Sequence, residues 1–323
     1  IPNNNKNNNN DFKYYTIVAC VYMTRYLIAG DSNGLSDPYC RITINGETRE
    51  TSVKNKCVNG IWNEKLIFDT VSFNYKEPAT WPCMLITVLD KDITDSDMLG
   101  YSYLWLNDTN YSYNQIKKIK PKWEQLYLKK SNRAQGQILL SFFILDNEHR
   151  ELIKKIEIEP ETIPYKVEIN ALGLRDLKPL SFIKIKKPFI SFDLNSINVS
   201  TKGESIRPVN TIPNDKGNNP NINSVMKFNV NLPKDEIFIP EFQCDVYDHV
   251  LGGLSKKILG IFLIDIRQII RETKRHYKEE YEEAERVIKI LQEKENKNGI
   301  RNNFIINEKE EINGINTSNR LIN

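Results

Sequence analysis

The chain has 323 residues, of which 40% are hydrophobic and 27% charged, the balance of a folded protein with one to three domains. Its formal net charge of +3 is too small to indicate binding of nucleic acid, so we expect no such partner. No run approaches the roughly 18 apolar residues of a membrane span. The start, IPNNNKNNNN, lacks an initiator methionine and the apolar core of a signal peptide, so we interpret the sequence as a piece of a larger, membrane-anchored protein.

The first half of the chain alternates short apolar runs with turn residues. Residues 1–12 are asparagine-rich and are expected to be disordered. Tyr15, Ile17, Ala19 and Val21 alternate with a second set of residues, as in a half-buried strand. Asn45-Gly46 is a hairpin signal. The other strands predicted here are 39–45, 47–53, 64–70, 84–90 and 137–145, and so many short strands favour an antiparallel sandwich over residues 13–148.

The second half repeats this plan after a charged, proline-bearing stretch, 149–164, that we predict to be a linker. A second domain is expected over 165–271, with strands 165–172, 189–194, 225–232, 242–248 and 258–264 and a long polar loop at 195–223. Apolar residues then recur at helical spacing, which predicts an amphipathic helix followed by a polar tail over 272–323. Packing on the neighbouring domain and binding to a partner are the two roles open to this helix.

Aspartates gather in two places of the first half. Asp31 and Asp37 lie six residues apart on a loop that enters a strand. The second group follows strand 84–90 and comprises Asp90, Asp92, Asp95 and Asp97. Calcium requires six to eight hard oxygen ligands, and Lys91 is the only cation in either loop, so the pattern predicts a Ca²⁺ site. Ordinary turn aspartates are the alternative.

Three segments carry a resemblance to a known family. GLSDPYCRI, NGIWNEKLIF and VLDKDITDSDMLG resemble, in this order, a C2 domain over most of residues 13–148. The resemblance implies an eight-stranded antiparallel sandwich with three calcium-binding loops at one end. The metal ligands that it implies are Asp31, Asp37, Asp90, Asp92 and Asp97. The sequence departs from the family pattern at Gly60, where proline is usual, and in a third loop one residue short, which leaves Asp95 as an alternative to Asp97.

The second domain resembles a narrower group. YKVEINALGLRDLKPL, NNPNINSVMKFNVNLPKDEIFIP and VYDHV resemble a C2 domain of the ferlin family, and the tandem order fits that family too. Lys186 and Lys187 stand where the first domain has Ser36 and Asp37, and Asp248 is the remaining carboxylate of its third loop. We therefore expect this domain to bind no calcium and to serve as a spacer or protein contact. The asparagine-, lysine- and isoleucine-rich composition is similar to that of apicomplexan ferlin-like proteins.

Ferlins are large proteins with many C2 domains and a C-terminal membrane anchor, associated with vesicle fusion. The resemblance implies calcium-dependent binding to anionic phospholipid on the cytoplasmic face of a vesicle or secretory organelle, with fusion-machinery proteins as further partners. Calcium would act as an electrostatic switch that cancels the negative field of the aspartates. A calcium-independent structural or protein-docking tandem is the alternative. The sequence has no glycine-rich phosphate loop, nucleophile elbow or metal-ligand histidine pair, so we do not expect an enzyme.

Two further sets of residues are candidates for contact with lipid. The apolar loop residues expected to contact the membrane are Ile28, Leu35 and Ile93, with packing inside its own loop as the alternative for Leu35. The basic residues expected to contact headgroups are Arg49, Lys54 and Lys56, with a solvated face as the alternative. A second basic group is formed by Lys184, Lys186 and Lys187.

Overall fold

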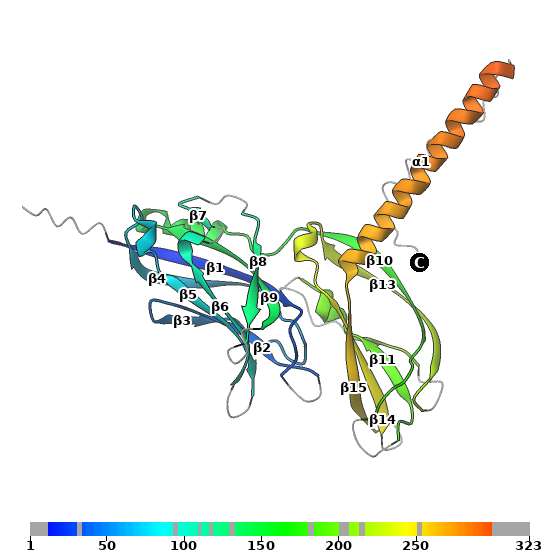
Figure 1. Cartoon of the computed structure of the whole chain (residues 1–323), viewed down its shortest axis with the longest axis horizontal. Helices are drawn as coiled ribbons and strands as arrows, with labels where there is room; N and C mark the ends of the chain where they lie inside the picture. The colour runs from blue at the N-terminus through cyan, green and yellow to red at the C-terminus, as the bar shows by residue number, and fades with distance from the viewer. Residues whose placement is uncertain are drawn as a thin grey trace, which may run out of the picture. The chain divides into compact units, whose positions relative to one another are not determined.

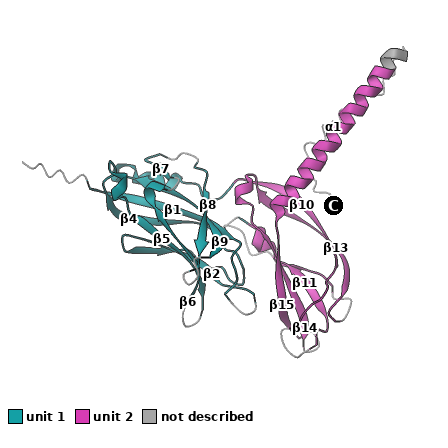
Figure 2. Ribbon diagram, in the orientation of Figure 1, with its two compact units in different colours: residues 1–160, 199–204 teal, residues 161–198, 205–323 magenta. Residues whose placement is uncertain are grey.

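The structure is a computed structural model that describes residues 12–30, 34–92, 96–108, 111–115, 119–128, 133–179, 184–199, 207–212, 217–250 and 254–298. It divides into two compact units, coloured teal and magenta in Figure 2. Unit 1 comprises residues 1–160 with 199–204, and unit 2 comprises residues 161–198 with 205–323. Both are built from antiparallel strands and one long helix follows, which confirms the predicted fold class (Figure 1).

Unit 1 is a sandwich of nine strands. They are β1 (Lys13–Arg25), β2 (Pro38–Ile44), β3 (Glu47–Glu50), β4 (Ile61–Phe73), β5 (Cys83–Lys91), β6 (Ser96–Trp105), β7 (Tyr111–Tyr113), β8 (Lys122–Tyr127) and β9 (Ala134–Leu145). Hydrogen bonding follows the order β3-β2-β5-β6-β8-β9-β1-β4, and the short β7 pairs in parallel with β9. Three 3-10 helices complete the unit: η1 (Pro78–Thr80), η2 (Leu106–Asp108) and η3 (Asn147–Lys155).

Two local predictions for unit 1 have different outcomes. Asn45 and Gly46 have φ angles of 48° and 82°, as the predicted two-residue hairpin between β2 and β3 requires. The prediction of a half-buried first strand is wrong, because β1 is buried on both faces from Tyr15 to Thr24. The reason is tertiary: β1 lies between β4 and β9, and η3 also contacts it.

Gly60 has a packing role in unit 1. A Cβ atom at this position would lie 2.4 Å from the ring of Trp62, which is fully buried. The Trp62 indole Nε1 donates a hydrogen bond to the carbonyl of Ser52 at 2.9 Å. The glycine therefore allows the ring to lie against the backbone of its own turn, a consequence that extends beyond the turn itself.

Part of the segment for which we predicted a linker is folded onto unit 1. The η3 helix begins at Asp146, whose carboxylate accepts hydrogen bonds from the amides of Glu148 and His149. Lys65 Nζ donates to the carbonyl of Ile156 at 3.0 Å. Arg150 forms an ion pair with Asp69 at 2.9 Å. These contacts place the end of unit 1 about ten residues later than the sequence indicated.

Unit 2 contains six strands among its described residues. They are β10 (Thr162–Gly173), β11 (Pro188–Phe192), β12 (Val209–Asn210), β13 (Asn221–Pro233), β14 (Phe242–Val250) and β15 (Ser255–Ile264). One sheet is β10-β13 and the other is β12-β11-β14-β15. Two 3-10 helices, η4 (Leu194–Ile197) and η5 (Glu236–Phe238), lie between strands. Eight strands were expected, but β15 is followed directly by a helix, α1 (Ile266–Asn298).

The predicted polar loop at 195–223 is partly structured where it is described. It includes most of η4, the short strand β12 and the start of β13. Ile197 and Ile222 are buried in the core of unit 2. The apolar residues in this stretch were too sparse to show a period, so the sequence pattern missed these elements.

The predicted amphipathic helix is confirmed as α1, and its two ends differ. Ile266 and Ile270 are buried in the core of unit 2. Val287 and Leu291, further along the helix, are exposed by about half of their surface. Packing on the domain therefore accounts for the first turns of α1 alone. No helix within the described residues is long and apolar enough to cross a membrane.

Candidate calcium site

Strand register brings the two aspartate groups of unit 1 together. β5 pairs with β2 on one side and with β6 on the other. In this register Asp90 lies opposite Pro38 in β2 and opposite Asp97 in β6. Asp37 immediately precedes Pro38. Three of the five predicted ligands, Asp37, Asp90 and Asp97, therefore lie at the same end of three adjacent strands.

Asp90 is the most strongly fixed of these side chains. It is only 2% exposed, and its Oδ1 accepts a hydrogen bond from the backbone amide of Asp37 at 2.6 Å. Its Oδ2 lies against the backbone of Gly30, where a Cβ atom would be 2.5 Å away. A side chain at position 30 would displace this carboxylate. The glycine therefore allows the first loop to approach Asp90 closely.

Asp37 is held by backbone groups as well. Its Oδ1 accepts a hydrogen bond from the amide of Lys56 at 2.6 Å, and its carbonyl accepts one from the amide of Lys91 at 3.0 Å. Lys56 has a φ of 55°, which turns its amide toward the aspartate loop. Outer contacts of this kind orient metal ligands before the metal arrives.

The rest of the predicted ligand set is less ordered around this pair. Asp92 and Asp97 are exposed, and Asp31 lies outside the described residues, as does the alternative ligand Asp95. Among the described residues, no three aspartate, glutamate, histidine or cysteine side chains are close enough to form a metal site. Completion of the site thus depends on the loop that contains Asp31.

The donors that are present suit a calcium ion. They are carboxylate oxygens, the hard ligands that Ca²⁺ prefers. No ion pair between described residues involves Asp37, Asp90 or Asp97. A buried carboxylate such as Asp90 normally needs a charge partner, so a cation at this end of the sheet would satisfy an otherwise costly arrangement.

The apolar loop residues separate into different environments. Ile28 is 64% exposed near the site, as a membrane-contacting residue must be. Leu35 is 7% exposed, which is the packed arrangement considered as its alternative. Ile93 lies outside the described residues. Sequence reasoning missed Met98, which follows Asp97 directly and is 37% exposed; its position beside a ligand was the available signal.

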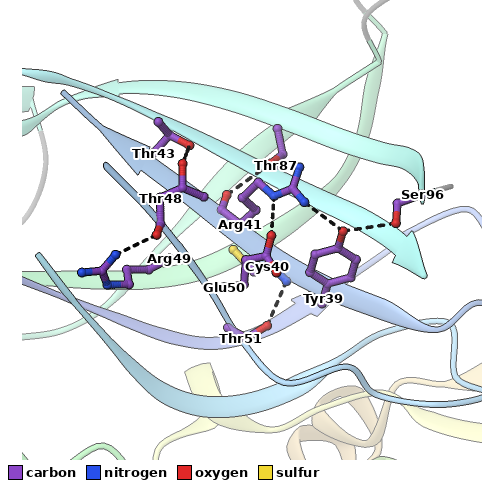
Figure 3. A network of polar contacts seen from close by, with 10 residues as sticks. All are labelled: Tyr39, Cys40, Arg41, Thr43, Thr48, Arg49, Glu50, Thr51, Thr87 and Ser96. Atoms are coloured by element: carbon purple, nitrogen blue, oxygen red, sulfur yellow. Dashed lines mark hydrogen bonds and ion pairs between the residues drawn. The ribbon is translucent and has the colours of Figure 1, made fainter. Parts of the chain in front are cut away.

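The predicted basic patch is largely paired with acids. Arg49 forms an ion pair with Glu47 and also donates to the carbonyls of Thr48 and Ile67. Lys54 Nζ lies 4.0 Å from Glu64. Figure 3 shows that Arg49 belongs to a network along β2 and β3, in which Arg41 also pairs with Glu50 at 2.6 Å. Exposed pairs of this kind leave little net positive charge for lipid, so the solvated-face alternative is favoured for Arg49 and Lys54.

Unit 2 repeats the register of this site with different side chains. Asp248 in β14 lies opposite Pro188 in β11 and Lys257 in β15, as Asp90 lies opposite Pro38 and Asp97. The Lys187 amide donates to Asp248 Oδ1 at 2.6 Å, the distance also found from Asp37 to Asp90. Both units also shift register one residue before this aspartate. Lys187 therefore occupies the position of Asp37, and Lys257 that of Asp97.

Comparison with known proteins identifies the relatives of this arrangement. Residues 15–126 match the sequence model of the C2 domain. The chain is 28% identical to human (Homo sapiens) myoferlin over 266 residues, which cover 76% of this chain and 12% of myoferlin. It is 24% identical to mouse (Mus musculus) Fer-1-like protein 4 over 268 residues, covering 71% of this chain and 12% of that protein. The chain thus spans a small part of the length of these ferlins.

Among solved structures, the chain is similar to the two calcium-bound C2 domains of extended synaptotagmin 2. The identity is 16%, and the alignment covers 79% of this chain and 84% of that one with a TM-score of 0.33.

Proposed function

We propose that this chain, a C2-domain protein related to the ferlins, binds anionic phospholipid membranes through unit 1 in response to Ca²⁺. The observation that carries the proposal is the alignment of Asp37, Asp90 and Asp97 at one end of β2, β5 and β6, with Asp37 and Asp90 already oriented by backbone amides. The family match of unit 1 and the ferlin relatives support the same role.

The residues of unit 1 would hold the ion through Asp37, Asp90, Asp92 and Asp97, together with Asp31. When bound, calcium would supply positive charge and coordination positions for lipid oxygen atoms. In its absence the exposed carboxylates repel an anionic surface. Ile28 and Met98 would add apolar contact with the interface, because both are exposed beside the aspartates.

The proposed setting follows from the relatives. Ferlins and this chain share C2 domains, and we place the activity on the cytoplasmic face of a vesicle or secretory organelle during membrane fusion. We propose a binding protein rather than an enzyme, with fusion-machinery proteins as additional partners.

The test is vesicle sedimentation of the 323-residue chain. Phosphatidylcholine vesicles with and without phosphatidylserine are compared in calcium and in EGTA, across a salt series. Calcium should increase binding to the anionic vesicles alone, and salt should weaken this binding because charges are screened beyond roughly 8 Å at physiological ionic strength. Calcium-independent binding, or equal binding to neutral vesicles that salt does not weaken, would contradict the proposal for unit 1.

A further inference from the structure

The loop end of unit 2 carries lysines where unit 1 carries calcium ligands. Lys187 and Lys257 replace Asp37 and Asp97 by strand register, and Val250 follows Asp248 at the spacing of Asp92 from Asp90. Lys186 and Lys256 lie beside the two substituted positions. Four described aspartates at the end of unit 1 thus correspond to two lysines, one aspartate and one valine in unit 2.

The one aspartate of this set is used inside the fold. Asp248 is 3% exposed and accepts hydrogen bonds from the backbone amides of Lys186 and Lys187 at 2.6 to 3.1 Å. These bonds offset its negative charge and fix the chain that carries the two lysines. The side chains of Lys186 and Lys187 remain exposed. The end of unit 2 consequently presents positive charge to solvent.

The lysines of this end differ from other lysines of unit 2. Lys227 and Lys234 form ion pairs with Glu168 and Glu161, at 2.9 and 3.3 Å. No ion pair between described residues involves Lys186 or Lys187. Lys256 lies with its Nζ 4.0 Å from the ring centre of Tyr247, a contact that preserves its charge. Their charges are therefore available to an anionic ligand.

An apolar side chain stands in the same place. Leu254, between β14 and β15, is 92% exposed, the highest value among the large hydrophobic side chains of the described residues. It lies two residues before Lys256. An exposed leucine beside lysines suits the boundary of an anionic membrane, where the apolar group enters and the charges meet headgroups. A free phosphate ion would need no such apolar group.

We propose that the loop end of unit 2, formed by Lys186, Lys187, Leu254, Lys256 and Lys257, binds the surface of an anionic phospholipid membrane without calcium. The fixed lysine charges take the place that calcium would have in unit 1. Unit 2 is then a constitutive membrane contact, not only a spacer. This proposal does not depend on the calcium site of unit 1.

The experiment measures vesicle binding of the full chain in EGTA, which removes the calcium-dependent contribution. Vesicles of phosphatidylcholine with phosphatidylserine are compared with phosphatidylcholine alone. Each lysine near an anionic surface contributes roughly a factor of five to the partition coefficient, so Lys186→Gln with Lys187→Gln should weaken binding about 25-fold. Leu254→Asn should weaken it about ten-fold, and this loss should persist at high salt.

The matched control is Lys227→Gln with Lys234→Gln, which removes the same charge from the same unit. Lys227 lies within β13 and Lys234 beyond its far end, away from the lysine loops. Binding of this variant should fall by much less than that of the loop variant. Circular dichroism should be the same for both variants, since the backbone amides that bind Asp248 are retained.

Several results would overturn the proposal. They are no binding of the wild-type chain in EGTA, equal binding to neutral vesicles, or an equal loss in the control variant. Displacement from vesicles by inorganic phosphate, beyond that caused by chloride at the same ionic strength, would assign the lysines to a soluble anion instead. A calcium response that survives while the EGTA binding is absent would leave unit 1 supported and reject unit 2 alone.

Discussion

The loop ends of the two units share one backbone plan and carry opposite charges. In both units a buried aspartate at the end of the central strand accepts a 2.6 Å hydrogen bond from the amide that precedes an X-Pro step. In unit 1 the surrounding positions are aspartates, and in unit 2 they are lysines or valine. The shared aspartate is therefore part of the architecture of this loop end, and calcium specificity resides in the residues around it.

A second difference lies beyond β6 and β15. In unit 1 the chain continues through β8 and β9, which cover the end of β6 and pair with β1. In unit 2 the chain enters α1 instead, and within the described residues β10 pairs with β13 alone. The two units thus use the same first six strands with different completions.

Loss of the unit 1 carboxylates should have the largest effect. Asp90→Asn with Asp92→Asn should abolish calcium-dependent vesicle binding and the thermal stabilisation by calcium, which at a hundred-fold excess over Kd amounts to about 2.7 kcal/mol. Calorimetric melting with and without calcium measures the stabilisation. Asp248→Asn at the matched position of unit 2 should leave the calcium response intact. A retained calcium response in the double variant would rule out these two ligands.

Reversal of one charge should move unit 1 toward the character of unit 2. Asp37→Lys reproduces the residue found at Lys187, and it should raise vesicle binding in EGTA while removing most of the calcium response. The expected gain in EGTA is at least about five-fold, because one lysine is added and one carboxylate is lost. Sedimentation with phosphatidylserine vesicles measures both quantities. No gain in EGTA would show that charge at this position is not what separates the two units.

Two glycines test the different completions. A Cβ atom at Gly100 would lie 3.0 Å from Leu126 of β8, whereas Gly260, its counterpart in unit 2, has nothing within 4 Å. Gly100→Ala should destabilise unit 1 by about 1–3 kcal/mol through overpacking. Gly260→Ala should be neutral or stabilising by up to about 1 kcal/mol. Hydrogen exchange of peptides from β6 and β15 reports each unit separately, and equal effects would contradict the difference in coverage.

The smallest effect concerns η3, which only unit 1 carries at this junction. His149 Nδ1 lies 2.7 Å from Asp146 Oδ1. The hydrogen bond to Asp146 raises the pKa of His149, while burial acts in the opposite direction. A raised histidine pKa means that the pair stabilises fully below the unfolded value of about 6.5 and loses this contribution as pH rises through the folded value.

For Asp146, burial raises the pKa, but hydrogen bonds from His149 and Asn114 outweigh it and hold the pKa below its usual range. Its contribution is present above the unfolded value of about 3.9 and is lost as pH falls through the folded value. His149→Gln should therefore increase amide exchange in η3 more at pH 5.5 than at pH 8. In an Asp146→Asn background this pH dependence should disappear. Persistence of the dependence would mean that another group is responsible.

The sequence by itself predicted the all-β fold, most strands, the Asn45-Gly46 hairpin, the terminal helix and the aspartate groups. These features depend on local patterns of apolar residues and turn residues, which are readable without neighbours. β6 was missed because a register shift interrupts its alternation near Gly100. The very short β7 and β12 gave no period at all.

The tertiary structure decided which residues meet. The full burial of β1, the packing of Leu35 and the pairing of Arg49 and Lys54 with glutamates all depend on strands distant in sequence. So does the equivalence of Lys187 with Asp37, and of Lys257 with Asp97, which rests on strand register. A sequence specifies the charge of each side chain, but the register between strands determines which charges stand around one site.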